Sequence, residues 1–297
     1  MALLNLGFGI SVTPYADAYP ALVEQVLAAE RGGLDLVGIQ DHPYQRRFLD
    51  TFALIADLLA KTSRLRFFPD VASLPMRPPA MIAKAAASLD VMSGGRFELG
   101  LGAGAFWDAV AGMGGVVRGA GKRGDALEEA IWLIRAALDV GPQRAIVRGP
   151  GPLYPIPGYP AGPPPAHRIE IWVGAMAPKG LDIIGRLADG WVPGGGTSRI
   201  AAFPRLNARI DEAAEAAGRD PNAIRRILNI SGTITDGRRG EGPLDGPVDQ
   251  WVETLAGWAI ELGVDSFVLW PADAGTGQIE RFAAEVAPVV RLQAASR

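Results

Sequence analysis

The stretch Asp90-Val-Met-Ser-Gly-Gly-Arg-Phe-Glu-Leu-Gly-Leu-Gly-Ala-Gly104 carries the strongest information on the fold. Four apolar residues recur at helical spacing and predict an amphipathic helix that runs to Ser93: Ile82, Ala85, Leu89 and Met92. Gly94 and Gly95 are expected to end this helix, because glycine accepts the left-handed backbone of a helix terminus. Residues 97–101 then read as a short buried strand, whose carboxyl end carries no bulky side chain. Bare backbone beyond a strand is where α/β proteins bind ligands.

The composition limits the classes of protein to consider. The chain has 297 residues, 48% of them hydrophobic, a formal net charge of −3 and no cysteine. An acidic balance argues against a nucleic-acid partner, and no apolar run approaches the ~18 residues of a membrane span. The absence of cysteine removes disulfides and thiolate nucleophiles, and the amino terminus lacks a basic signal region. We therefore expect a cytoplasmic protein without nucleic-acid or membrane partners.

Short apolar runs alternate with helical patterns along the whole chain. Eight strands are predicted, at residues 4–10, 34–40, 65–71, 97–101, 169–173, 190–193, 227–235 and 264–270. Near-continuous apolar strands that alternate with helices indicate a parallel sheet covered by helices. Eight such units close a (β/α)₈ TIM barrel, typically in ~250 residues. We predict one barrel domain over residues 1–297, with a doubly wound open sheet as the alternative.

The length in excess of a plain barrel lies in loops. Residues 141–167 contain nine prolines and five glycines, which predicts an irregular insertion in place of a helix or strand. Residues 236–247 form a second loop rich in glycine and proline.

Four predicted strand exits carry candidate chemistry, since the active site of a TIM barrel lies at these ends. Asp41 precedes His42, so the aspartate can orient the ring or raise its pKa for proton transfer, or it can simply cap a helix. Phe106 and Trp107 can stack on a flat ligand, or they can be core aromatics beneath the long loop. The small residues before Pro178 and the triplet that starts at Gly194 can expose backbone N–H groups to an anion.

The order of these motifs resembles that of the luciferase-like flavin and deazaflavin oxidoreductases. The family signature is a helix that ends in Leu-Asp-x-x-Ser-x-Gly-Arg, followed by Gly-x-Gly-x-Gly, and here these motifs occupy residues 89–96 and 100–104. Further matches in the same order are residues 38–42, 77–80, 171–174 and 188–191. The resemblance covers residues 7 to about 271. It implies a bacterial luciferase-like TIM barrel with insertion loops.

The resemblance also implies a cofactor and the residues that hold it. The cofactor is FMN, which would make the protein a monooxygenase, or coenzyme F420, which transfers hydride only. A cis peptide between Asp70 and Val71 is implied beneath the central ring, and His42 is implied as the catalytic residue. The residues expected to bind the cofactor are Asp41, Asp70, Val71, Ala72, Gly102, Gly104, Phe106, Asp108, Gly174, Ala175, Met176, Gly194 and Gly195.

Some features separate this chain from parts of the family. Relatives that oxidise sugar phosphates carry a glutamate directly after the Gly-x-Gly motif, where this chain has Ala105. We expect a small organic substrate and a homodimer. Two other functions stay open: a non-catalytic barrel that serves as a partner subunit, and a metal-dependent barrel hydrolase. The hydrolase needs clustered ligands, and the chain offers only His42 and His167 as histidines. We predict no metal site.

Overall fold

The computed structural model describes residues 6–141 and 145–295, and its centre is a parallel sheet. The sheet has nine strands in the order β3-β2-β1-β13-β10-β9-β8-β5-β4. Their bounds are β1 Gly7–Val12, β2 Leu36–Ile39, β3 Arg66–Pro69, β4 Ala72–Ser73, β5 Leu99–Gly102, β8 Ile171–Gly174, β9 Gly190–Trp191, β10 Arg225–Ile230 and β13 Ser266–Leu269. A strand is present at each of the eight predicted places, with shifts of a few residues at the ends, and residues 4–5 of the first lie outside the described part of the chain. The predicted strand 227–235 is shorter than expected, because β10 ends at Ile230 and Thr233–Ile234 form β11 in a separate sheet.

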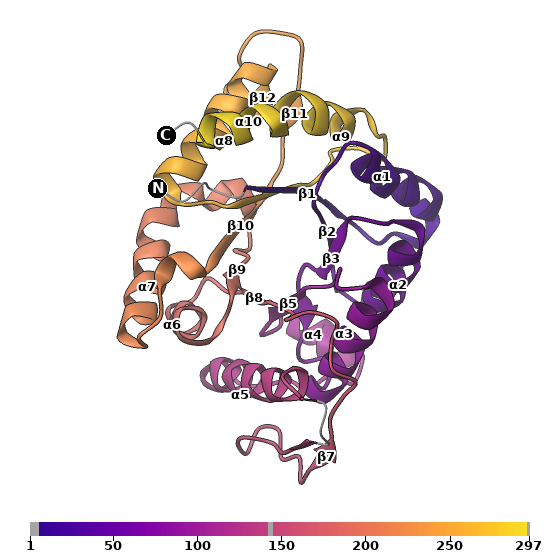
Figure 1. Cartoon of the computed structure of the whole chain (residues 1–297), viewed down its shortest axis with the longest axis vertical. Helices are drawn as coiled ribbons and strands as arrows, with labels where there is room; N and C mark the ends of the chain where they lie inside the picture. The colour runs from indigo at the N-terminus through magenta and orange to yellow at the C-terminus, as the bar shows by residue number, and fades with distance from the viewer. Residues whose placement is uncertain (1–5, 142–144, 296–297) are drawn as a thin grey trace.

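The sheet closes on itself because its two edges are consecutive pieces of chain. β3 and β4 are separated only by Asp70 and Val71, which are joined by a cis peptide bond at the implied position. β4 pairs with β5, and β3 reaches the same neighbour through a parallel bridge between Phe67 and Phe97. Figure 1 looks along the resulting ring, with the helices outside it. The predicted (β/α)₈ barrel is confirmed, and the open doubly wound sheet is excluded.

The helices cover the outside of the barrel. They are α1 Tyr19–Arg31, α2 Thr51–Lys61, α3 Pro79–Ser93, α4 Trp107–Gly112, α5 Ala120–Leu138, α6 Pro178–Leu187, α7 Phe203–Ala216, α8 Val248–Leu262, α9 Gly277–Arg281 and α10 Ala287–Ala295, with a π-helical turn at Phe282–Val286. Short 3₁₀ segments lie at Ala16–Ala18, Gly196–Ala202 and Pro221–Ala223.

The helix in the opening stretch follows most of its prediction. α3 ends at Ser93, and Gly94 caps it with φ 69° in the left-handed region. Ile82 and Leu89 are buried. The inclusion of Met92 in the buried stripe was wrong, because its side chain is 72% exposed. The helix turns Met92 away from the barrel in its last turn, where the apolar spacing alone gives no warning.

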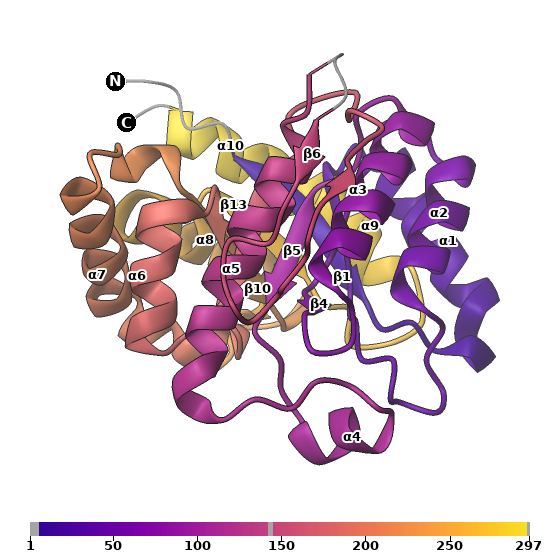
Figure 2. The same ribbon diagram turned by 90° about the horizontal axis from the view of Figure 1, so that it is seen from below.

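The insertion at residues 141–167 is more regular than predicted. β6 (Ile146–Val147) pairs with β7 (Tyr159–Pro160) in a short antiparallel ladder, while residues 142–144 lie outside the described part of the chain. In Figure 2, β6 lies at one end of the barrel and α4 at the other. The second loop likewise holds β12 (Asp245–Gly246), which pairs with β11 (Thr233–Ile234).

One side chain fastens the insertion to the barrel. His167 contacts the carboxylates of Asp90 at 2.7 Å and Glu98 at 3.1 Å, and its pKa is raised, first by the hydrogen bond to Glu98. Asp90 is fully buried and also accepts the backbone N–H groups of Ala166 and His167.

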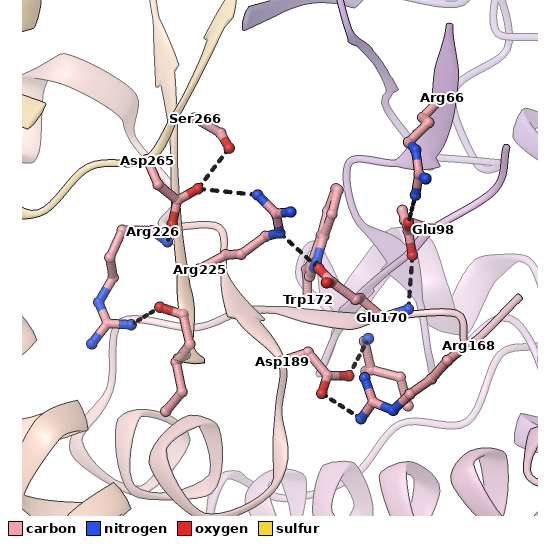
Figure 3. Close-up of polar contacts among 12 residues, drawn as sticks. Arg66, Glu98, Arg168, Glu170, Trp172, Asp189, Arg225, Arg226, Asp265 and Ser266 are labelled. Atoms are coloured by element: carbon pink, nitrogen blue, oxygen red, sulfur yellow. Dashed lines mark hydrogen bonds and ion pairs between the residues drawn. The ribbon is translucent and has the colours of Figure 1, made fainter. Parts of the chain in front are cut away.

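Paired charges fill the amino-terminal end of the barrel, as Figure 3 shows. Glu98 binds Arg66 and accepts the backbone N–H of Glu170 at 2.7 Å. The Glu170 side chain in turn accepts Arg225 Nε at 2.9 Å and Trp172 Nε1 at 2.8 Å. The buried Glu98 uses both of its carboxylate oxygens in such contacts, as a buried charge requires, whereas both partners of the partly buried Glu170 bond to its Oε2. Paired charges therefore occupy this end of the barrel.

Candidate active site

Inward-facing residues alternate along each strand, and small ones dominate near the carboxyl ends. Val71 occupies the space that this leaves: a Cβ added to Gly102 would approach its side chain to 2.7 Å, and one added to Gly174 to 2.9 Å. Gly100 lies one layer deeper, where an added Cβ would approach the Pro69 carbonyl oxygen to 2.0 Å and the Val71 side chain to 3.1 Å. These glycines therefore make room for Val71, which forms an apolar floor across the barrel mouth.

Asp70 lies on the same floor, in a small polar cluster. Its carboxylate accepts a hydrogen bond from Ser11 Oγ at 3.1 Å and another from Asn229 Nδ2 at 3.3 Å. Gly38 lies beside it, where a side chain would meet the carboxylate at 3.1 Å. Burial raises the pKa of Asp70 to about 6, against the smaller opposing effect of the two hydrogen bonds. A carboxyl group in this condition can hold or release a proton near neutral pH.

Three buried polar atoms near this floor have no partner among the described residues. They are Ser73 Oγ, Asn229 Oδ1 and Trp270 Nε1. The three residues lie at or just beyond the carboxyl ends of β4, β10 and β13, so they belong to the barrel mouth. Because a buried polar atom without a partner costs free energy, such a cluster indicates a place where a ligand or water completes the hydrogen bonds.

His42 lies at the rim of the mouth among aromatic rings. Its Nδ1 is 2.7 Å from the hydroxyl of Tyr44, and its ring meets Phe106 edge-on with centroids 5.4 Å apart. Phe48 lies on another side, at 6.5 Å. Burial lowers the pKa of His42, although the charge of Asp41 acts in the opposite direction. The imidazole is therefore neutral at physiological pH.

Asp41 has a different role from the one expected beside a histidine. Its side chain is buried and accepts two hydrogen bonds from Arg77, at 2.8 and 2.9 Å, and one from the backbone N–H of Ser73 at 2.9 Å. It does not orient the His42 ring, whose Nδ1 bonds Tyr44, and it does not raise the pKa of His42 above the ordinary value. Asp41 instead joins the exits of β2 and β4.

The structure separates the two aromatic residues after β5. Phe106 is 62% exposed and has φ 52°, so of the two alternatives the role of a core aromatic does not hold for this residue. Trp107 is half-buried and stacks under the guanidinium of Arg123 at 3.9 Å. Asp108 lies exposed in the first turn of α4. Phe106 is thus the aromatic residue of this loop that faces His42.

Two further exits form the opposite side of the mouth. Ala175 is fixed by a hydrogen bond from Trp191 Nε1 to its carbonyl at 2.7 Å, directly before the start of α6. Met176 is partly buried. Lys179 pairs with Asp125, so its charge is shared. Gly194 and Gly195 are exposed, and a Cβ on Gly194 would point into open space.

Several residues of the mouth were not singled out from the sequence. They are Ser11, Tyr44, Ser73, Asn229 and Trp270. Asn229 did leave a signal, since it is a polar residue within an apolar strand, at an inward-facing position. Ser11 and Trp270 lie near strand ends, where a strand boundary predicted one residue too early or too late changes the role assigned to a residue. Tyr44 follows a turn whose geometry the sequence does not specify.

Comparison with known proteins places this architecture in a family. A family model described as luciferase-like monooxygenase matches residues 3–239. The chain belongs to this family. Among the described residues, no group of three or more His, Asp or Glu side chains is placed to hold a metal ion, and no helix is long and apolar enough to cross a membrane.

Three similar proteins illustrate the range of this family. An uncharacterized protein of Mycobacterium tuberculosis is 36% identical over 190 residues, which are 64% of this chain and 62% of that protein. An F420-dependent glucose-6-phosphate dehydrogenase of Gordonia bronchialis is 32% identical over 234 residues, 76% of this chain and 68% of the enzyme. A riboflavin lyase crystallised with modified FMN shares the fold, with a TM-score of 0.82 at 16% identity over 98% of this chain and 92% of its own.

Proposed function

We propose that this protein is an oxidoreductase that uses FMN or coenzyme F420 to oxidise or reduce a small organic substrate. The observation that carries the proposal is the set of unpartnered buried atoms on Ser73, Asn229 and Trp270. They surround an apolar floor that Val71 forms, and a flat ring with polar edges meets both requirements. The F420-dependent relative and the FMN-bound neighbour are consistent with such a ring.

The residues present fit such a cofactor in two parts. Val71, Ser73, Asn229 and Trp270 would hold the ring, and the backbone amides at 174–176 and 194–195 would hold its phosphate near the start of α6. When bound, either cofactor would supply hydride transfer, and FMN would also supply reaction with O₂. Gly104 and Phe106 would border the substrate, and Asp41, Ala72 and Gly102 would support the floor from below.

His42 would then act on the substrate. It is neutral, half-buried and the histidine of the mouth, so it would donate or accept a proton at an oxygen of the substrate. Asp70, whose pKa lies near 6, would take up or release a proton within the floor of the mouth. Asp108 is exposed and would contact the outer part of the cofactor.

An absorption titration tests the proposal. Purified protein is titrated separately with FMN and with F420, and a saturable spectral change with one of them is expected. A folded protein that binds neither would contradict the proposal and favour the alternative of a partner subunit without a cofactor.

A substitution at Gly194 tests the phosphate end. Gly194→Asp adds a negative charge beside the predicted phosphate, and we expect the Kd of the cofactor to rise about tenfold, which corresponds to about 1.4 kcal/mol. Gly194→Asn is the matched control, because it has the same shape without the charge. Equal Kd values for the two variants would move the phosphate away from this loop.

We also propose that residues 1–297 act as one domain, that the protein is a homodimer, and that it is cytoplasmic. Sedimentation measurements and cell fractionation test the last two.

A further inference from the structure

The turn after β2 brings Tyr44 back onto His42. The backbone N–H of Gln45 donates to the carbonyl of His42 at 2.9 Å, and that of Phe48 donates to the carbonyl of Gln45 at 3.0 Å. These bonds fold residues 42–48 into a compact turn. As a result, the Tyr44 hydroxyl lies 2.7 Å from His42 Nδ1, and the two rings lie 5.6 Å apart.

The direction of this hydrogen bond follows from the chemistry of its two groups. A phenol is a stronger acid than a neutral imidazole N–H, and an imidazole nitrogen is a better acceptor than a phenol oxygen. The hydroxyl of Tyr44 therefore donates, and Nδ1 accepts. A neutral imidazole that accepts at Nδ1 carries its proton on Nε2.

The other ring nitrogen of His42, Nε2, lies among aromatic side chains. No hydrogen bond to His42 Nε2 occurs among residues 6–141 and 145–295. The neighbouring rings are Tyr44, Phe48 and Phe106, and none of them presents an acceptor for it apart from the hydroxyl already used. Phe106 holds its place through a left-handed backbone conformation. The Nε2–H group is thus a free donor in an aromatic setting.

We propose that Tyr44 is a positioning residue that fixes His42 in the Nε2-protonated tautomer, so that His42 binds an oxygen acceptor on a substrate with apolar flanks. This inference rests on the proposed function for the identity of the reaction. The tautomer itself belongs to the protein without cofactor, and it can be measured there.

Nuclear magnetic resonance of protein labelled with ¹⁵N-histidine tests the tautomer directly. The chain has two histidines, so His167→Gln assigns both sets of signals. In the wild type, His42 should show an unprotonated Nδ1 and a protonated Nε2 at neutral pH. In Tyr44→Phe, this pattern should give way to a mixture of both tautomers. Tyr15→Phe is the control, because Tyr15 meets Phe48 edge-on and its hydroxyl makes no hydrogen bond to His42 within the described residues, and it should keep the wild-type pattern.

Turnover then tests whether Tyr44 acts through His42. Tyr44→Phe should lower kcat about tenfold in the wild-type background, as expected for the loss of one hydrogen bond. In the His42→Gln background the same substitution should have little effect, because the amide cannot change tautomer. A protonated Nδ1 in the wild type, an unchanged NMR pattern in Tyr44→Phe, or equal losses in both backgrounds would overturn the proposal. Absence of cofactor binding would contradict the proposed function alone, since the NMR result does not depend on it.

Discussion

The two ends of the barrel differ in how fully their polar groups are hydrogen-bonded. At the amino-terminal end, Glu98 and Glu170 each bind an arginine and accept an N–H group, and His167 fastens the insertion there. At the carboxyl end, Ser73, Asn229 and Trp270 each keep a buried polar atom without a partner. One end gains stability from closed pairs, whereas the other leaves hydrogen bonds open for a ligand.

The largest effect on activity is expected at the carboxyl end. His42→Ala should lower turnover by about 10²–10⁴-fold, because it removes the candidate acid–base group, while the unfolding midpoint should change little. Steady-state kinetics and thermal unfolding measure the two quantities. His42→Asn serves as the control that keeps a donor but does not titrate. If both variants turned over substrate at the wild-type rate, His42 would only line the pocket.

The reverse pattern is expected at the amino-terminal end. Glu98→Ala leaves Arg66 and His167 without their shared carboxylate, and we expect a loss of about 3–5 kcal/mol in the free energy of unfolding. Cofactor affinity of the folded fraction should stay unchanged. Glu253→Ala is the matched control, because its pair with Arg239 is exposed to solvent and should contribute little to stability. If Glu98→Ala weakened cofactor binding without lowering stability, the division between the two ends would fail.

Asp70 gives a smaller effect that depends on pH. Its pKa rises from 3.8 to about 6 on folding, so the folded state keeps a proton that the unfolded state loses in this window. Stability should therefore fall as pH rises from about 4 to 6 and then level off. Asp70→Asn cannot titrate, and relative to the wild type it should be up to about 3 kcal/mol more stable at pH 7.5 than at pH 4, from about two pKa units.

Denaturant unfolding across this pH range measures the difference. Asp108→Asn, which changes an exposed carboxylate on α4, is the control and should keep the shape of the wild-type curve. A parallel pair of curves for wild type and Asp70→Asn would show that Asp70 has the same proton affinity in both states.

The sequence was sufficient for the barrel because its signals are periodic. A helix that ends at Gly94 and an apolar run after it need only local spacing to be predicted. The exposure of Met92 was not predicted, because helical spacing does not show which way the last turn of the helix faces. Gly102 at the end of β5 was correctly seen as lacking a bulky side chain, yet the residue that fills its space, Val71, comes from the link between β3 and β4. The sequence could not tell that Gly102 serves packing as well as access.

The candidate site was less predictable because its contacts join distant segments. Asp41 lies beside His42 in sequence but is bound by Arg77, thirty-six positions away. Asn229 reaches Asp70 across the barrel, and this contact depends on the register of β10. Tyr44 is local, yet its position depends on a turn that residue types alone do not define.

The pairing of β1 with β13 has a consequence for synthesis and folding. Gly7 lies opposite Ser266, so β1 cannot pair with β13 until nearly the whole chain has been synthesised. The other closing contact, Phe67 with Phe97, spans only thirty positions and can form early. Long-range pairing of this kind slows folding and leaves strand edges unprotected meanwhile. A nascent chain that stalls before Ser266 would expose β1 and β10 as open edges, where it is most prone to aggregate or to recruit a chaperone.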